Sequence, residues 1–309
     1  MRYVPVIIAV LVWSWSEVLI KYLQAARFDA YSQNFYRYGA SALLMALWAA
    51  FTRPEKTVRG LKMWPRFFLP ALFGTLYQTL WVIGFYRLAP AFAAIIGRSN
   101  IIVTIGVAVI FFPEERRLAS DRRFLAATAT ALLAVSGVIL LHRRGSEGAV
   151  VEAGFWWGVA LVLIGSAMWV LYAFSVKRLV REVGPAVAFA GSSTIMSVFL
   201  FVIMLTAWGM GASEPGRLLD ARIFDVAVLF GSGIICVGAA QSVYYKSIDL
   251  VGVSTSQIIT LVSPLAVGVI SYFMYGERLS VLQWCSGVAL LASLAYIIDL
   301  DRRLSANAG

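Results

Sequence analysis

The sequence predicts an all-α integral membrane protein in which ten transmembrane helices form two inverted five-helix repeats. Three observations predict this fold. Of the 309 residues, 61% are hydrophobic and only 14% are charged, whereas about a quarter are charged in a soluble domain. The apolar residues gather in ten blocks, each long enough to cross a hydrocarbon core of about 30 Å. The two halves of the chain also align with each other at a nearly constant offset.

The ten apolar blocks define the predicted spans in order. The connections are short, and the longest contain the Gly, Pro and charged residues typical of loops. The first block lacks the small-residue cleavage site of a signal peptide, so we expect it to be a helix of the protein. The predicted spans are residues 5–22, 35–51, 66–86, 92–112, 123–141, 155–174, 186–208, 224–246, 253–275 and 283–299.

The lysines and arginines predict the orientation of these spans. Sixteen fall at the two termini and in alternate loops, eight fall in the other five loops, and Arg37 and Arg98 fall within spans. Loops rich in Lys and Arg remain in the cytoplasm. We therefore predict a multi-pass protein of the cell (plasma) membrane with both termini cytoplasmic, and we attribute the formal net charge of +10 to topology and not to nucleic-acid binding.

An internal repeat divides the chain into predicted halves at 1–145 and 146–309. A shift of 156 residues aligns Trp13 and Lys21 with Trp169 and Lys177, and a shift of 162 aligns 85–116 with 247–278 without a gap. Because each half has five spans, the second half is expected to cross the membrane in the opposite direction. Inverted repeats of this kind are typical of secondary transporters.

Several kinds of chemistry have no support in the sequence. There is no GxxxxGK[ST] loop for ATP, and the single histidine, His142, offers no catalytic triad. Cys236 and Cys285 lack metal-ligand spacing and are expected to be small buried hydrophobic residues. We predict neither an enzyme, nor a metal site, nor a cofactor.

Three charged residues fall inside predicted spans, where charge is costly and indicates function by default. By the rise of about 1.5 Å per residue, Glu17 and Arg98 lie roughly 18–21 Å from the cytoplasmic ends of their spans, and Arg37 lies at a similar height. Either Glu17 binds a substrate ammonium or a coupling proton while an arginine binds a carboxylate, or Glu17 and an arginine form a permanent ion pair. For Arg37 we favour a structural role near the membrane edge, reaching the headgroups.

Polar and aromatic residues repeat at helical spacing in three other spans. Gln78 and Trp81 are three residues apart, and so are Gln241 and Tyr244. A stripe of four polar residues is expected to face protein or a cavity, because lipid would leave its groups unsatisfied. Pro264 follows this stripe and is expected to leave a backbone carbonyl, that of Thr260, without its helical partner. The stripe comprises Ser254, Gln257, Thr260 and Ser263.

Trp13, Trp81 and Trp169 are predicted to lie deep in the membrane, where they either pack or stack on a flat or cationic substrate. Asn100 lies about 200° around an ideal helix from Arg98. We therefore expect only one of these two side chains to face a cavity.

The sequence resembles the ten-helix EamA-type permeases of the drug/metabolite transporter superfamily. The resemblance implies export of small metabolites through a cavity lined by spans 1–4 and 6–9, with spans 5 and 10 as supports. In the first half, Ile101-Ile102 stands where the resemblance leads us to expect a proline. The matching residues are Trp13, Lys21, Arg37, the segment from Phe112 to Leu118, Trp169 through Lys177, Ser263-Pro264 and the segment from Tyr275 to Leu279.

These observations predict a secondary transporter of a small polar or aromatic metabolite such as an amino acid, coupled to protons through Glu17 or facilitative. The alternatives are a lipid-carrier flippase of the same fold and an intramembrane enzyme, which the scarcity of His and Cys disfavours. The expected partners are the lipid bilayer, a small-molecule substrate and protons. The candidate substrate-binding residues are Trp13, Glu17, Gln78, Trp81, Arg98, Trp169, Gln241, Tyr244, Gln257 and Thr260, and the candidates for coupling or ion pairing are Glu17, Arg37 and Arg98.

Overall fold

The computed structural model describes residues 2–98, 100–111, 121–126, 129, 130, 133 and 154–276, together with scattered positions between 280 and 303. Every regular element in this part of the chain is a helix. Most of predicted spans 5 and 10, His142, and the Glu-Arg segments after spans 4 and 9 lie outside the described residues. Of the two cysteines, Cys236 is buried as expected, but Cys285 is exposed, so the prediction for Cys285 was wrong.

The first three spans form long helices at the predicted places. Helix α1 covers Val4–Ala25, α2 covers Ala30–Thr52, and a 3₁₀ turn, η1 (Trp64–Phe67), leads into α4 (Phe68–Arg87). The start of α2 is fixed by its N-cap, because the Asp29 carboxylate accepts hydrogen bonds from the amides of Tyr31 and Ser32.

The connection between α2 and α4 contains a helix where the sequence predicted a loop. Helix α3 covers Pro54–Lys62, with a proline in its first turn, an acid near its start and two basic residues near its end. These are favourable helix-end residues. A search for membrane-spanning blocks passes over α3 because it is short and charged.

The predicted fourth span is two helices. Helix α5 covers Pro90–Gly97 and α6 covers Asn100–Phe111. The large ring of Trp81 packs where a Cβ atom on Gly97 would lie, only 2.4 Å from a ring atom. A glycine at the end of α5 therefore permits the close approach of α4.

The second half contains longer helices. Helices α9 (Phe155–Val183) and α10 (Pro185–Gly209) are joined at Gly184, whose φ of 88° favours glycine. After the short α11 (Arg217–Asp220), one continuous helical rod comprises α12 (Ile223–Ser232), the π-helical segment η2 (Gly233–Ala239) and α13 (Ala240–Val251).

The predicted ninth span bends at the polar stripe. It consists of α14 (Val253–Ile259), the 3₁₀ turn η3 (Thr260–Val262) and α15 (Ser263–Tyr275). Pro264 does interrupt the helix, but the Thr260 carbonyl is not left free. The tighter turn gives that carbonyl a new donor, the amide of Ser263.

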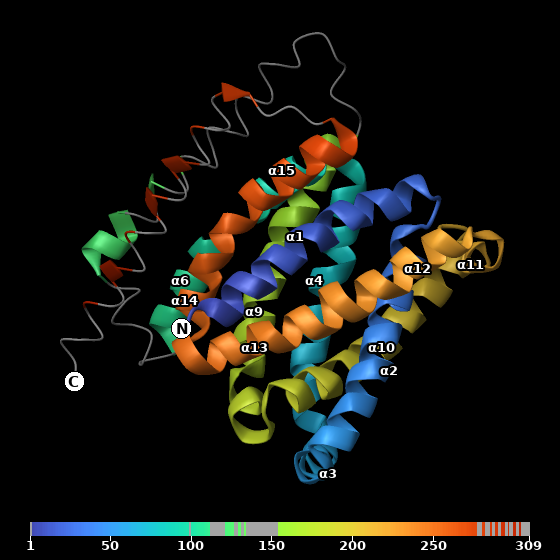
Figure 1. The fold of residues 1–309 in the computed structure, drawn as a ribbon, viewed down its shortest axis with the longest axis horizontal. Helices are drawn as coiled ribbons and strands as arrows, with labels where there is room; N and C mark the ends of the chain where they lie inside the picture. Colours follow the sequence, from blue (N-terminus) through green and yellow to red (C-terminus); the bar gives the residue numbers. More distant parts are fainter. Residues whose placement is uncertain are drawn as a thin grey trace.

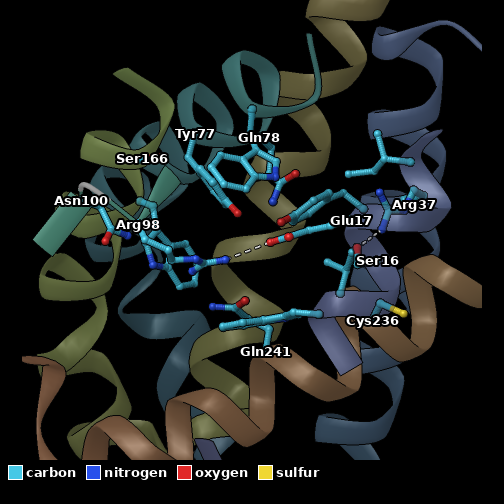
Figure 2. A pocket seen from close by; sticks show the side chains of 16 residues that line it. Ser16, Glu17, Arg37, Tyr77, Gln78, Arg98, Asn100, Ser166, Cys236 and Gln241 are labelled. Atoms are coloured by element: carbon cyan, nitrogen blue, oxygen red, sulfur yellow. Dashed lines mark hydrogen bonds and ion pairs between the residues drawn. The ribbon is translucent and has the colours of Figure 1, made fainter. Parts of the chain in front are cut away.

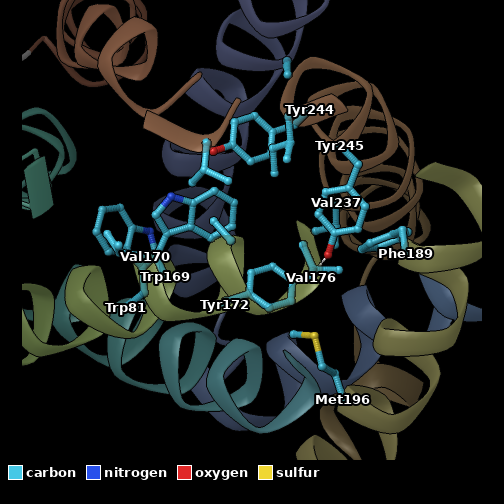
Figure 3. Close-up of a cluster of buried hydrophobic side chains, with 14 of the residues drawn as sticks. Trp81, Trp169, Val170, Tyr172, Val176, Phe189, Met196, Val237, Tyr244 and Tyr245 are labelled. Atoms are coloured by element: carbon cyan, nitrogen blue, oxygen red, sulfur yellow. Dashed lines mark hydrogen bonds between the residues drawn. The ribbon is translucent and has the colours of Figure 1, made fainter. Parts of the chain in front are cut away.

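Helices of the two halves pack against one another throughout the molecule. Helix α4 lies along α9, α2 along α10, and α1 lies between α13 and α15 (Figure 1). Buried aromatic and aliphatic side chains fill the space between α9, α10 and the α12–α13 rod (Figure 3). Five helical stretches of the described chain are long and apolar enough to cross a membrane: Val4–Ala25, Trp64–Arg87, Phe155–Val183, Pro185–Gly209 and Ile223–Val251.

Hydrogen bonds tie the halves together at one end of the bundle. The Asp29 carboxylate accepts a bond from the Ser213 hydroxyl at 2.9 Å and one from the Glu214 amide at 3.0 Å. The Tyr22 hydroxyl donates to Asp225 at 2.6 Å. Burial raises the pKa of Asp29, but the hydrogen bonds from Ser32, Glu214 and Ser213 outweigh it and hold the pKa below its ordinary value. We call this set of contacts the end latch.

Candidate functional site

A pocket in the centre of the bundle draws side chains from both halves (Figure 2). Its lining comes from α1, α2, α4, the α5–α6 break, α9, η2 and α13. The lining residues are Trp13, Ser16, Glu17, Ile20, Arg37, Tyr38, Tyr77, Gln78, Trp81, Arg98, Asn100, Ser166, Trp169, Cys236, Val237 and Gln241.

An ion pair between Glu17 and Arg98 spans the pocket. An Arg98 guanidinium nitrogen lies 3.0 Å from Glu17 Oε1, and the two side chains are only 8% and 9% exposed. The other carboxylate oxygen of Glu17 and Nε of Arg98 have no hydrogen-bond partner among the described residues. The pair therefore keeps polar atoms available for a ligand.

Arg37 faces the same pocket, which corrects the expectation that it reaches the headgroups. Its side chain is 2% exposed and donates a hydrogen bond to the Ser16 hydroxyl (Figure 2). No carboxylate of the described residues lies within ion-pair distance of it. Arg37 is buried because η2 packs closely over this part of α2. A Cβ atom on Gly233 of η2 would meet the backbone of Arg37.

The α5–α6 break brings Arg98 and Asn100 to the pocket together. The expectation that only one of them faces a cavity was wrong, because the 100° step per residue applies only within a continuous helix. Asn100 is buried, and its Oδ1 has no partner in the described chain. The start of α6 at Asn100 follows Arg98 closely in the chain.

Aromatic rings form the apolar wall of the pocket. Trp13 meets Trp169 edge-on with ring centroids 5.3 Å apart, and both contact Tyr244 at 4.8 and 5.4 Å. Tyr77 lies between Trp169 and Trp81, at 5.0 and 5.6 Å. Trp13 and Trp169 therefore pack against each other, Trp81 packs against Tyr77, and all three tryptophans line the pocket.

Three of the predicted site residues lie behind the lining. Gln257 accepts a hydrogen bond from the Trp169 indole at 3.0 Å, and Thr260 donates its hydroxyl to the Gln257 backbone carbonyl at 2.6 Å. Tyr244 packs against the Trp13 and Trp169 rings and is not among the lining residues. These residues position the aromatic wall and do not line the pocket.

Eight lining residues were not among the candidate site residues: Ser16, Ile20, Tyr38, Tyr77, Asn100, Ser166, Cys236 and Val237. Ser16 adjoins Glu17, and Tyr38 follows Arg37, so proximity to the buried charges was the signal available for these two. Cys236 and Val237 lie in η2, whose wider π-helical turn shifts the positions that face inward. Periodicity based on the α-helix does not locate them.

Long apolar helices packed around a buried, ion-paired pocket define a multi-pass membrane transport protein. The chain belongs to the EamA-like transporter family, whose sequence model matches residues 3–142 and again residues 156–298. It is 19% identical over 288 residues to an uncharacterized transporter from Haemophilus influenzae, a match covering 89% of this chain and 90% of the relative. A solved crystal structure shares the fold at 16% identity, with a TM-score of 0.70 and 98% coverage of both chains.

Proposed function

We propose that this transporter exports a small zwitterionic metabolite with an apolar or aromatic side chain, such as an amino acid, by alternating access. The observation that carries the proposal is the pocket itself, which combines a buried carboxylate, two buried guanidinium groups and a wall of aromatic rings. A zwitterion presents one carboxylate and one ammonium group, and its side chain requires an apolar surface. The pocket offers a partner for each.

The charges support a specific placement of the substrate. Arg37 has a guanidinium with no acidic partner among the described residues, and an arginine fork binds a carboxylate well. The amino end of α6 beside Arg98 adds partial positive charge, as broken helices do in transporters. We assign the substrate carboxylate to Arg37 and Arg98, and the substrate ammonium to Glu17.

The size of the pocket supports a transport cycle with motion. Its free volume is about 60 Å³, enough for about two water molecules, whereas binding pockets for small molecules measure about 300–1,000 Å³. The aromatic wall must separate before a metabolite can enter. We propose that this is a closed state, with the end latch closing one side of the membrane.

The proposed cycle uses the ten-span inverted-repeat topology. Rocking of one five-helix half against the other would expose the pocket to each side in turn. Both termini are proposed to lie in the cytoplasm of a plasma membrane, which puts the end latch on the outer face. A buried ionic pocket also favours a water-soluble substrate over a lipid-linked one.

Reconstitution in liposomes tests the proposal. Labelled phenylalanine, leucine and glutamate are offered to the purified protein with and without a pH gradient, using wild type, Glu17→Gln and the exposed control Asp220→Asn. We expect uptake of the first two amino acids, stimulated by the gradient in wild type and control. In Glu17→Gln we expect uptake that is independent of the gradient and lower than in wild type, because the ammonium group loses its partner. Uptake that is the same with and without the gradient, and the same in Glu17→Gln, would contradict proton coupling. The absence of any amino-acid uptake would overturn the proposed substrate class.

A further inference from the structure

Helix α3 has two chemically distinct faces that both remain exposed. Val58 is 53% exposed and Leu61 is 69% exposed, and Trp64, just after the helix, is 62% exposed. At about 100° per residue, Lys56 and Arg59 lie about 160° and 100° around the helix from Val58, and Lys62 lies at the border of the apolar face, about 40° from Val58. A helix with this division lies in the interface between headgroups and acyl chains.

The apolar face of α3 continues into a groove between α2, η1 and α10. The groove has a volume of about 210 Å³, and apolar atoms dominate its walls. Its depth comes from small residues, because Ala46, Ala49, Ala190 and Gly191 place almost no side chain there. Leu61 and Trp64 form its rim and join it to the exposed face of α3.

The basic face of α3 carries charge that the protein does not neutralise. Within the described residues, Lys56, Arg59 and Lys62 take part in no ion pair, whereas nearby Arg66 pairs with Glu182 at 2.7 Å. Glu55 is the only acidic residue of the helix. The uncompensated positive charge therefore lies at one end of an apolar groove that is open to the side of the bundle.

We propose that α3 and this groove form a binding site for one anionic phospholipid. An acyl chain occupies the groove beside Ala49 and Gly191, and Arg59 and Lys62 bind the phosphate headgroup. Charge complementarity selects the occupant: a neutral lipid satisfies the groove but not the three cations, and free phosphate satisfies the cations but not the groove. The site lies outside the transport pocket and does not depend on the proposed substrate.

Lipid binding to the purified full-length protein tests the proposal by native mass spectrometry, with phosphatidylglycerol and phosphatidylcholine of identical chains. We expect one phosphatidylglycerol to bind in preference to phosphatidylcholine. Each basic residue near an anionic headgroup contributes about 1 kcal/mol, so Arg59→Gln with Lys62→Gln is expected to weaken phosphatidylglycerol binding about 30-fold. The same charge loss at Arg122 and Arg123 is the control and is expected to leave binding unchanged.

A second pair of variants tests the groove. Thr194 lines the groove, and Thr194→Trp fills it from an exposed position on α10. Thr206→Trp is the matched control, because both hydroxyls bond to the carbonyl four residues earlier at 2.8 Å, and Thr206 lies outside the groove. If the introduced ring in Thr194→Trp displaces only two methylene groups of the acyl chain from the groove, phosphatidylglycerol binding is expected to weaken about tenfold.

Three outcomes would overturn the lipid site. The first is equal binding of the two lipids. The second is unchanged phosphatidylglycerol binding in Thr194→Trp, which would show that the chain does not occupy the groove. The third is competition by inorganic phosphate that removes the bound lipid completely, which would show that the cations alone hold the ligand.

Discussion

Removing the carboxylate of Glu17 tests whether the buried ion pair is charged. The two side chains are less than a tenth exposed and lie 3.0 Å apart, so solvent screens them little. Replacing one member of such a pair leaves the other charge buried without compensation, which costs about 3–5 kcal/mol. We therefore expect Glu17→Gln and Arg98→Met each to lower the free energy of unfolding by about that amount.

The double variant supplies the decisive comparison. With both charges removed, no uncompensated ion remains, and replacing buried pairs by apolar groups is often neutral. Glu17→Gln with Arg98→Met is therefore expected to lie within about 2 kcal/mol of wild type, far from the sum of the single effects. The assay is denaturant unfolding of the purified protein in detergent micelles, followed by circular dichroism.

Two results would refute this reasoning. Additive single effects would mean that the residues do not interact in the folded protein. A Glu17→Gln variant that loses less than about 1 kcal/mol, beside a costly Arg98→Met, would mean that the Glu17 carboxyl is already neutral. That second result would favour a proton carrier over a permanent ion pair.

Three further variants address Arg37, the end latch and the approach of α2 to η2. Arg37→Met is expected to leave the free energy of unfolding unchanged or to raise it, because it removes a buried charge without an acidic partner in the described chain. The KM for uptake of a carboxylate substrate is expected to rise at least about tenfold. A loss of stability with unchanged uptake would contradict this prediction. Asp29→Asn is expected to cost about 1 kcal/mol of stability at neutral pH, because a neutral amide accepts the hydrogen bonds from Ser32, Ser213 and Glu214 less strongly than a carboxylate does. Because the folded pKa of Asp29 is lowered, the stability that Asp29 contributes is present above the ordinary value of 3.8 and is lost as the pH falls through the folded value. Unfolding midpoints measured against pH should show this loss in wild type only. An identical loss in the variant would mean that another group causes it. Gly233→Ala places a Cβ 2.4 Å from the Arg37 carbonyl and is expected to cost about 1–3 kcal/mol in thermal unfolding, whereas Gly231→Ala meets nothing within 4 Å and should cost far less.

The long helices could be predicted from the sequence because hydrophobic length is the strongest signal in a membrane protein. Helices α1, α2, α4 and α10 begin and end within about five residues of the predicted spans, whereas α9 begins as predicted but continues to Val183, beyond the predicted end at residue 174. The signal fails where a helix is short and charged, as in α3. It also fails within an apolar block, because hydropathy does not detect the end of α5 at Gly97.

The candidate site could be predicted in part because buried charge is rare. Glu17 and Arg98 were selected for that reason, and the structure places them 3.0 Å apart. Arg37 was assigned to the membrane edge because its depth was measured along α2 alone, without the η2 segment that covers it. Gln257 and Thr260 have the spacing of a cavity stripe, yet their hydrogen bonds are made behind the aromatic wall.

The edge-on contact of Trp13 with Trp169 brings together two residues that correspond in the two halves of the sequence. The 156-residue offset aligns these two tryptophans, and the EamA-like family model matches the chain once around each of them, over residues 3–142 and 156–298. The buried charges near this contact have no charged counterpart at the corresponding positions. At the same offset Glu17 corresponds to Ala173, and at the offset of 162 Arg98 corresponds to Thr260. The duplicated scaffold thus retains matched aromatic residues at its centre, while only one copy carries the ionic chemistry.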